Sequence, residues 1–113
     1  MSAHPEALQL FDDATGDIAL GDLPEAIIKY RRCVELDPDY FEAWHALGMA
    51  LMKAEQYPEA IAAGLKSVEL NPNDQLAWSS LSMFYVRNHQ IPEAEAAGAK
   101  ARILSWGGKI RKE

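Results

Sequence analysis

The tripeptide Pro-Glu-Ala recurs three times along the chain at a constant spacing. Each copy follows the previous one by 34 residues, at positions 24–26, 58–60 and 92–94. The same period aligns Trp44 with Trp78. A fixed period of this length indicates an array in which one supersecondary unit is repeated and each copy packs on the next.

Each period contains two stretches with the spacing of an amphipathic helix. In the second period, Ala43, Leu47 and Leu51 recur every four residues, which predicts an apolar stripe along one helix. After a break at 55–57, Pro58 restarts a helix at its first turn, where its missing N–H costs nothing. The residue before a proline is disfavoured in helical geometry, so this second helix ends before Pro72. The other periods predict helices near residues 7–20, 24–36, 75–88 and 92–105, and no stretch alternates as a strand does.

Length and composition favour one soluble domain. The chain has 113 residues, a net charge of −6 and a single cysteine, Cys33, so no internal disulfide can form. Its apolar runs are far shorter than the ~20 residues that a membrane span requires, and its N-terminus lacks the pattern of a secretory signal. We therefore expect a cytoplasmic protein without a membrane-spanning segment.

Charge is distributed unevenly among the periods. Residues 1–40 carry a net charge of −6, residues 41–74 carry −3 and residues 75–113 carry +3. The acidic total argues against nucleic-acid binding, which needs a basic face. The polarity from an acidic front to a basic back leaves room for head-to-tail association of copies.

The repeated residues resemble the tetratricopeptide repeat (TPR) family. That family has a helix–turn–helix unit of about 34 residues with the pattern W-x₂-L-G-x₂-Y, then A-x₃-F, then P. The second period matches it at Trp44, Leu47, Gly48, Leu51, Ala60 and Pro72. The third period matches at Trp78, Leu81, Ser82, Tyr85 and Ala94, and the first at Ala14, Ala26, Tyr30 and Pro38.

The resemblance implies an all-α fold, a right-handed α-solenoid of three TPR repeats with six helices. We expect a single domain over residues 1–113 that contains three repeats and a basic C-terminal tail. The expected bounds of the repeats are about 7–40, 41–74 and 75–108, and those of the tail are 109–113.

The family resemblance also implies a concave groove that binds a peptide or helix of a partner protein. The matching groove positions are Phe11, Thr15, Ile18, His45, Met49, Met52, Lys53, Ser79, Met83, Val86 and Arg87. Methionine surfaces adapt to varied apolar partners, and Lys53 and Arg87 could hold a carboxylate. The alternative for Met49 and Met83 is packing against neighbouring helices.

One family function is not expected here. Family members that clamp the C-terminal carboxylate of chaperones carry lysines and asparagines at particular groove positions. The corresponding residues of this chain are Phe11, Thr15, Ala46, Met49 and Ser80. Binding of chaperone tails is therefore not carried over.

The first and second helices of the periods depart from the family pattern at a few positions. Gly64 and Gly98 stand where the family has an aromatic residue, and we expect Phe84 and Trp78 to fill the space beside Gly64. In the first helix, Asp13 and Asp17 fall at inward positions. Because a buried unpaired carboxylate is costly, we expect this helix to be rotated or shifted so that Phe11, Ala14 and Ile18 point inward instead.

The last helix has no following repeat to cover it. We expect a face of small residues there, together with a large aromatic residue that the repeat does not require: Ala94, Ala97, Gly98, Ala101 and Trp106. Two alternatives remain open: the small residues need no cover, or another chain packs there in a homo-oligomer. Trp106 either seals the open end or anchors a partner.

Signals for catalysis or cofactor binding are weak. Cys33 stands where the repeat requires a small buried residue, which favours a packed thiol over a nucleophile. The three histidines, His4, His45 and His89, lack metal-binding spacing. We expect no enzymatic activity, no metal and no cofactor, and a protein-interaction adaptor as the main function. A self-associating structural module, or an accessory subunit that uses the last helix, is the alternative.

Overall fold

A computed structural model describes residues 4–110 of the chain, and the regular secondary structure of this part is all α-helical. The described residues form six helices in the order that the repeats predict. Their bounds are α1 Pro5–Ala19, α2 Leu23–Leu36, α3 Phe41–Lys53, α4 Tyr57–Leu70, α5 Gln75–Arg87 and α6 Ile91–Ser105. The predicted helices are confirmed, and α4 begins at Tyr57 rather than after it. Residues 111–113 of the predicted basic tail lie outside the described residues.

Local signals explain where the helices begin. Proline occupies the first turn of α1, α2, α4 and α6, where its fixed φ is already helical. The side chain of Asp22 accepts a hydrogen bond from the backbone N–H of Glu25, and that of Asp74 accepts one from Ala77. These caps satisfy N–H groups that have no partner inside the helix.

The turn after the first helix of each hairpin is the same in all three copies. Gly21, Glu55 and His89, spaced by 34 residues, all have positive φ, at 84°, 63° and 61°. In each copy the next residue donates its N–H to a carbonyl five residues back, as Asp22 does to Asp17. This is the Schellman arrangement, which satisfies the last carbonyls of a helix. Only Gly21 adopts this conformation without the steric cost that a side chain brings.

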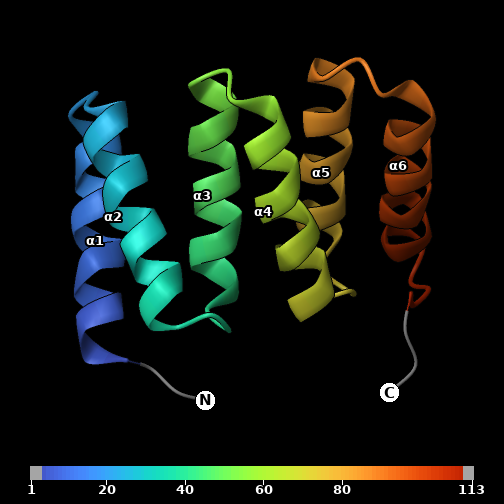
Figure 1. Ribbon diagram of the computed structural model, residues 1–113. Helices are drawn as coiled ribbons and strands as arrows, with labels where there is room; N and C mark the ends of the chain where they lie inside the picture. The colour runs from blue at the N-terminus through green and yellow to red at the C-terminus, as the bar shows by residue number, and fades with distance from the viewer. Residues whose placement is uncertain (1–3, 111–113) are drawn as a thin grey trace.

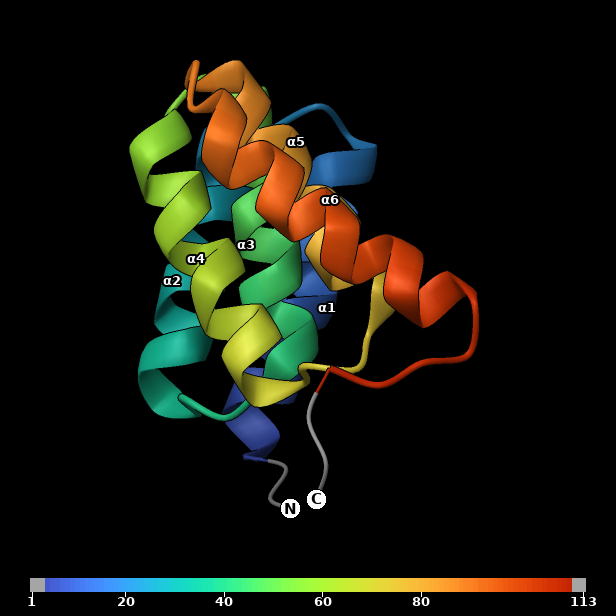
Figure 2. The same cartoon turned by 90° about the vertical axis from the view of Figure 1, so that its right-hand side faces the viewer.

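Consecutive helices pack as three antiparallel hairpins, α1–α2, α3–α4 and α5–α6, which stack side by side (Figure 1). Contacts of α2 with α3 and of α4 with α5 join the hairpins. Viewed along the stack, α1, α3 and α5 lie on one side and α2 and α4 on the other (Figure 2). We call the side of α1, α3 and α5 the inner face and the opposite side the outer face.

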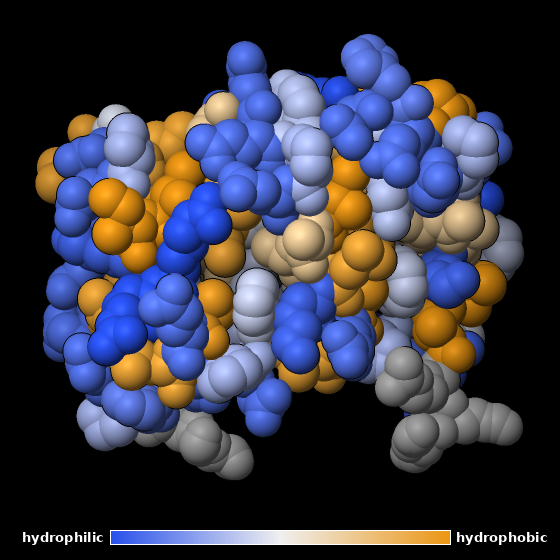
Figure 3. Space-filling view, in the orientation of Figure 1, coloured by the Kyte–Doolittle hydropathy of each residue, from blue (hydrophilic) through white to orange (hydrophobic). Residues whose placement is uncertain are grey.

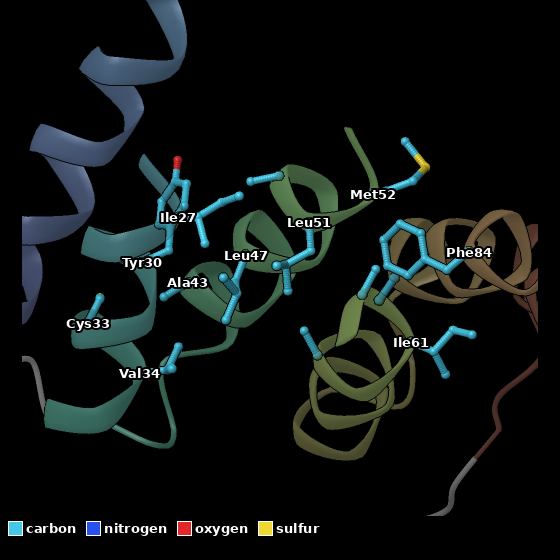
Figure 4. Close-up of a cluster of buried hydrophobic side chains, with 14 of the residues drawn as sticks. Ile27, Tyr30, Cys33, Val34, Ala43, Leu47, Leu51, Met52, Ile61 and Phe84 are labelled. Atoms are coloured by element: carbon cyan, nitrogen blue, oxygen red, sulfur yellow. The ribbon is translucent and has the colours of Figure 1, made fainter. Parts of the chain in front are cut away.

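The core runs through the stack between the two layers. Side chains from α2, α3, α4 and α5 meet there, including Ile27, Leu47, Leu51, Ile61 and Phe84 (Figure 4). Phe84 is among the largest fully buried side chains. A Cβ atom at Gly64 would lie 3.1 Å from Phe84 Cδ2 and 3.1 Å from Leu81 Cδ1. The predicted role of Phe84 beside Gly64 is therefore confirmed.

The predicted role of Trp78 beside Gly64 is wrong. Leu81 takes that space, and the Trp78 indole N–H donates to the carbonyl of Pro72 at 2.7 Å. Trp44 donates in the same way to Pro38, also at 2.7 Å. Each half-buried tryptophan thus links the start of its hairpin to the preceding turn, because its ring packs against neighbours while its indole N–H finds an acceptor.

Helix α1 turns its apolar residues toward the core, as we expect from the cost of burying its two aspartates. Ala14 is fully buried, and Phe11 and Ile18 pack against the core. The turn at Gly21 keeps the 34-residue spacing to the turns at Glu55 and His89, so the helix is not shifted along the sequence. Asp13 is exposed and Asp17 is half-buried, so neither carboxylate lies in the core.

Most of the α6 residues predicted for self-association are buried rather than exposed. Ala94, Ala97 and Ala101 are buried, because they point at α5 within the hairpin. Gly98 is half-buried, and Trp106 is 77% exposed. The burial of these alanines agrees with the alternative in which the small residues need no cover, and the exposure of Trp106 contradicts the alternative in which it seals the end.

Polar residues replace the apolar inter-repeat contacts on α6. Ile61 and Val68 of α4 are 8% and 5% exposed where the next hairpin covers them. Glu95 and Arg102 stand one period later, and both are exposed. Terminal repeats of a solenoid need such a polar surface at the end of the stack.

Candidate functional site

The inner face collects most of the residues predicted for a binding groove. Phe11, Ile18, His45, Met49 and Met83 are half-buried there. Thr15, Ser79, Lys53, Arg87 and Val86 are exposed. They come from α1, α3 and α5, so the structure brings residues from three helices onto one side of the molecule.

Met52 departs from this prediction. Its side chain is only 9% exposed and belongs to the hydrophobic core. Met52 lies about 60° around the helix from Met49, next to the buried Leu51, and packing at the border of the core covers its side chain. We therefore remove Met52 from the candidate site.

A cavity of about 230 Å³ lies on the inner face where α1 and α2 meet α3. Its walls are mostly apolar, and a lysine stands at its edge; the lining residues are Ile18, Tyr30, Ala46, Met49, Ala50 and Lys53. A second cavity of about 210 Å³ shares Ile18 and Lys53 and extends to Gly21 and Leu23. The site can thus receive an apolar side chain beside a cation.

Two cations stand at the same end of the inner face. Lys53 ends α3 and Arg87 ends α5, one period apart. Neither makes an ion pair with any residue in the part of the chain that the structure describes. Their side chains are exposed and available to a carboxylate, and an arginine can bind one through two parallel hydrogen bonds.

His45 lies in the middle of the inner face and is held from two sides. Its Nε2 is 3.1 Å from the Ser80 hydroxyl, and its ring stacks on Phe41 with centroids 6.3 Å apart. Burial lowers the pKa of His45 from its ordinary value of 6.5, and the nearby Asp74 partly opposes this effect. The imidazole is therefore neutral at pH 7.

Some residues of the cavity were not predicted from the sequence. Tyr30 reaches it from α2, and its hydroxyl shares a hydrogen bond of 3.0 Å with Thr15. Ala46 and Ala50 line it from α3. Tyr30, Gly64 and Gly98 occupy the same position in the three repeats. Tyr30 is the bulky side chain among them, and this difference is the sequence signal that points to it.

Groups with the potential for chemistry are few in residues 4–110. No cluster of three or more histidine, cysteine or acidic side chains could hold a metal ion there. Cys33 is buried, its thiol donates to the Ala7 carbonyl at 3.2 Å, and burial raises its pKa to about 11. A thiol in this state is a poor nucleophile at neutral pH. None of the described helices is long and apolar enough to cross a bilayer.

Family models match most of the helical region. A model described as a TPR repeat matches residues 17–55, and two described as tetratricopeptide repeats match residues 41–74 and 63–96. The three matches overlap and follow one another along the stack. They therefore support consecutive repeats of the same unit.

Solved structures share the fold. The first TPR domain of Spaghetti (RPAP3), bound to the HSP90 peptide SRMEEVD, has a TM-score of 0.86 and 19% identity over 94% of this chain and 84% of its own. The TPR2B domain of yeast Sti1, in a pHsp70 complex, has a TM-score of 0.86 and 21% identity over 92% of this chain and 83% of its own.

A chain of the CopN–Scc3 complex has a TM-score of 0.85 and 22% identity, and the match covers 90% of this chain but only 60% of that one. The present chain thus spans about three fifths of that relative's length. At these identities the likeness concerns the fold, and the family models supply the assignment. Together with the three stacked helical hairpins, they show that this chain belongs to the tetratricopeptide repeat family.

Proposed function

We propose that this protein is a non-catalytic interaction module that binds a segment of a partner protein on its inner face. The segment places an apolar side chain in the cavity between α1 and α3 and a carboxylate near Lys53 and Arg87. The observation that carries the proposal is the cavity of about 230 Å³ with apolar walls and Lys53 at its edge.

The comparisons support the general class of ligand. The RPAP3 domain is bound to an HSP90 peptide and the Sti1 domain is in a pHsp70 complex, so this fold accommodates segments of other proteins. The cavity is smaller than the ~300–1,000 Å³ of typical small-molecule sites, which favours single side chains of a peptide. Phe11, Ala46 and Met49 are apolar residues at positions where the chaperone clamp has polar ones, so the ligand is more apolar than a chaperone tail.

Substitutions on the inner face test the proposal. Met49→Glu puts a carboxylate into the wall of the cavity, and Met83→Glu puts one on α5, farther along the inner face over which the segment runs. Lys53→Glu combined with Arg87→Glu reverses the charge of the carboxylate site. Ile28→Glu is the matched control, because Ile28 is an exposed apolar residue of α2. Circular dichroism checks that every variant remains helical.

The measurement has two stages. Proteins captured by the full chain from a cell lysate are identified by mass spectrometry, and a peptide from the captured protein is then titrated with each variant. We expect the inner-face variants to weaken binding of that peptide at least tenfold and Ile28→Glu to leave it unchanged. Equal affinities for Met49→Glu, Met83→Glu and wild type would reject the site.

A further inference from the structure

The outer face contains two periodically equivalent junctions between hairpins, whose matching residues differ at two positions: Arg31 and Leu51 in the first are Leu65 and Tyr85 in the second. The first lies between α2 and α4 and the second between α4 and α6. In the first, Arg31 of α2 forms an ion pair of 3.2 Å with Glu59 of α4. In the second, Glu93 of α6 is the periodic equivalent of Glu59, but Leu65 stands where Arg31 would be.

The exchange leaves the second crevice open. Leu65 is 46% exposed, and its side chain cannot pair with a carboxylate. Within residues 4–110, Glu93 has no ion pair or hydrogen-bond partner from another side chain. Apolar side chains gather in the strip between α4 and α6 on the face that Figure 3 shows.

A cavity of about 200 Å³ occupies this crevice. Its floor and walls are apolar or aromatic and its two charged residues stand apart on α6; the lining residues are Leu65, Trp78, Leu81, Tyr85, Glu93, Ala96, Ala97 and Lys100. Lys100 is already engaged, because its Nζ lies 5.3 Å from the centre of the Trp78 ring. This contact holds the ammonium group over the indole and leaves it charged, and Glu93 is the lining residue whose carboxylate can accept hydrogen bonds from a cationic ligand.

We propose that this crevice, defined by Leu65, Trp78, Tyr85, Glu93 and Ala96, is a second docking site that takes an arginine side chain from a basic segment of a partner protein. The template is inside the same molecule: Arg31 reaches the carboxylate of Glu59 across the first crevice. A partner arginine lays its aliphatic stem on Leu65 and Ala96 and brings its guanidinium to Glu93. Arginine suits this role because its stem packs on apolar surface while its planar head binds a carboxylate.

Charge and size support this occupant. Residues 75–113 carry a net charge of +3 within the total of −6, so the attraction for a partner arginine comes at short range, from the unpaired carboxylate of Glu93. The cavity is below the size of a typical small-molecule site and is suited to one side chain. The site lies on the side of α5 opposite to the proposed inner-face site, so the two proposals are independent.

The test uses a library of random nine-residue peptides displayed on phage. The full chain and the variant Leu65→Arg are panned in parallel, and the peptides retained by the wild type alone are synthesised. Leu65→Arg restores the residue found at position 31 and closes the crevice over Glu93. Because the first crevice holds the same arginine in a folded environment, this variant is expected to fold, which circular dichroism checks.

We expect the peptides that depend on position 65 to be enriched in arginine. Replacing that arginine by citrulline, or Glu93 by glutamine, is expected to raise the dissociation constant at least tenfold. In NMR spectra, the largest shifts are expected at the Trp78 indole N–H and the amides of Leu65 and Ala96. Shifts centred on Met49 and Met83 would instead identify ligands of the inner face.

A matched variant supplies a gain of function. Arg31→Leu removes the arginine that closes the first crevice, and we expect it to add a second binding site for the same peptides at Glu59. The proposal is overturned if no peptide distinguishes the wild type from Leu65→Arg, if the distinguishing peptides lack arginine, or if Glu93→Gln leaves their affinity unchanged.

Discussion

Phe84 of α5 fills the space that the absent side chain of Gly64 leaves on α4. A Cβ atom at Gly64 would come within 3.1 Å of the Phe84 ring, whereas one at Gly98, a period later, would meet nothing closer than Ser82 Oγ at 3.5 Å. The same glycine position therefore has a packing role in one repeat and none in the next.

This difference predicts opposite effects of two identical substitutions. Gly98→Ala gains about 1 kcal/mol from the better helix propensity of alanine without a clash. Gly64→Ala gains the same propensity, but displacing Phe84 costs about 1–3 kcal/mol, so we expect a net loss. Urea denaturation measures the free energy of unfolding of both variants. An equal increase for the two would show that Phe84 yields without cost.

The Asp17–Lys29 ion pair predicts a charge requirement in the first hairpin. Asp17 Oδ2 lies 2.8 Å from Lys29 Nζ, at the repeat position where α3 has Leu51 and α5 has Tyr85. We expect Lys29→Met to lower the melting temperature, because it leaves a partly buried carboxylate without its partner. The double variant Asp17→Leu, Lys29→Met should recover most of the loss, since it restores the apolar residue of the other repeats. If the double variant is no more stable than Lys29→Met, the carboxylate is not the source of the cost.

The environment of His45 predicts a stability loss in mild acid. Its pKa is lowered in the folded state by burial, so the unfolded chain binds a proton more readily. Stability is complete above the unfolded value of about 6.5 and falls as the pH drops below it toward the folded pKa. We expect the difference in unfolding free energy between pH 7.5 and pH 5.5 to shrink in His45→Gln. If His45→Gln loses as much unfolding free energy between pH 7.5 and pH 5.5 as the wild type does, other groups cause the pH dependence.

The polar residues on α6 at the end of the stack predict that apolar substitutions there cause association. Glu95 and Arg102 occupy the positions at which Ile61 and Val68 contact the next hairpin. We expect the wild type to remain monomeric in light scattering and the double variant Glu95→Ile, Arg102→Val to associate, because it exposes an inter-repeat contact surface. A salt-sensitive oligomer of the wild type would instead restore the head-to-tail alternative, in which the acidic first repeat meets the basic last one.

The sequence predicts most of the helices because their ends are marked by local chemistry. Proline acts in the first turn through its fixed φ, and the repeated helix-ending turn acts through hydrogen bonds within a few residues. The period of 34 then fixes which helices pair. Predicting the candidate site was less complete, because an apolar residue on a helix can face either a neighbour or solvent. Met49 and Met52 differ by less than one helical turn, yet only the first stays on the inner face.

The amino-acid sequence alone determined the repeat, the helical hairpins and the family, because these follow from spacing and from interactions between near neighbours. Only the packing of one hairpin on the next decided the burial of Met52 and of the alanines of α6, the exposure of Trp106, and the cavities beside Lys53 and Leu65. These features depend on the volumes of side chains that are distant in sequence and meet across the stack. Burial and cavity shape are properties of such contacts, and no single segment of the chain contains them.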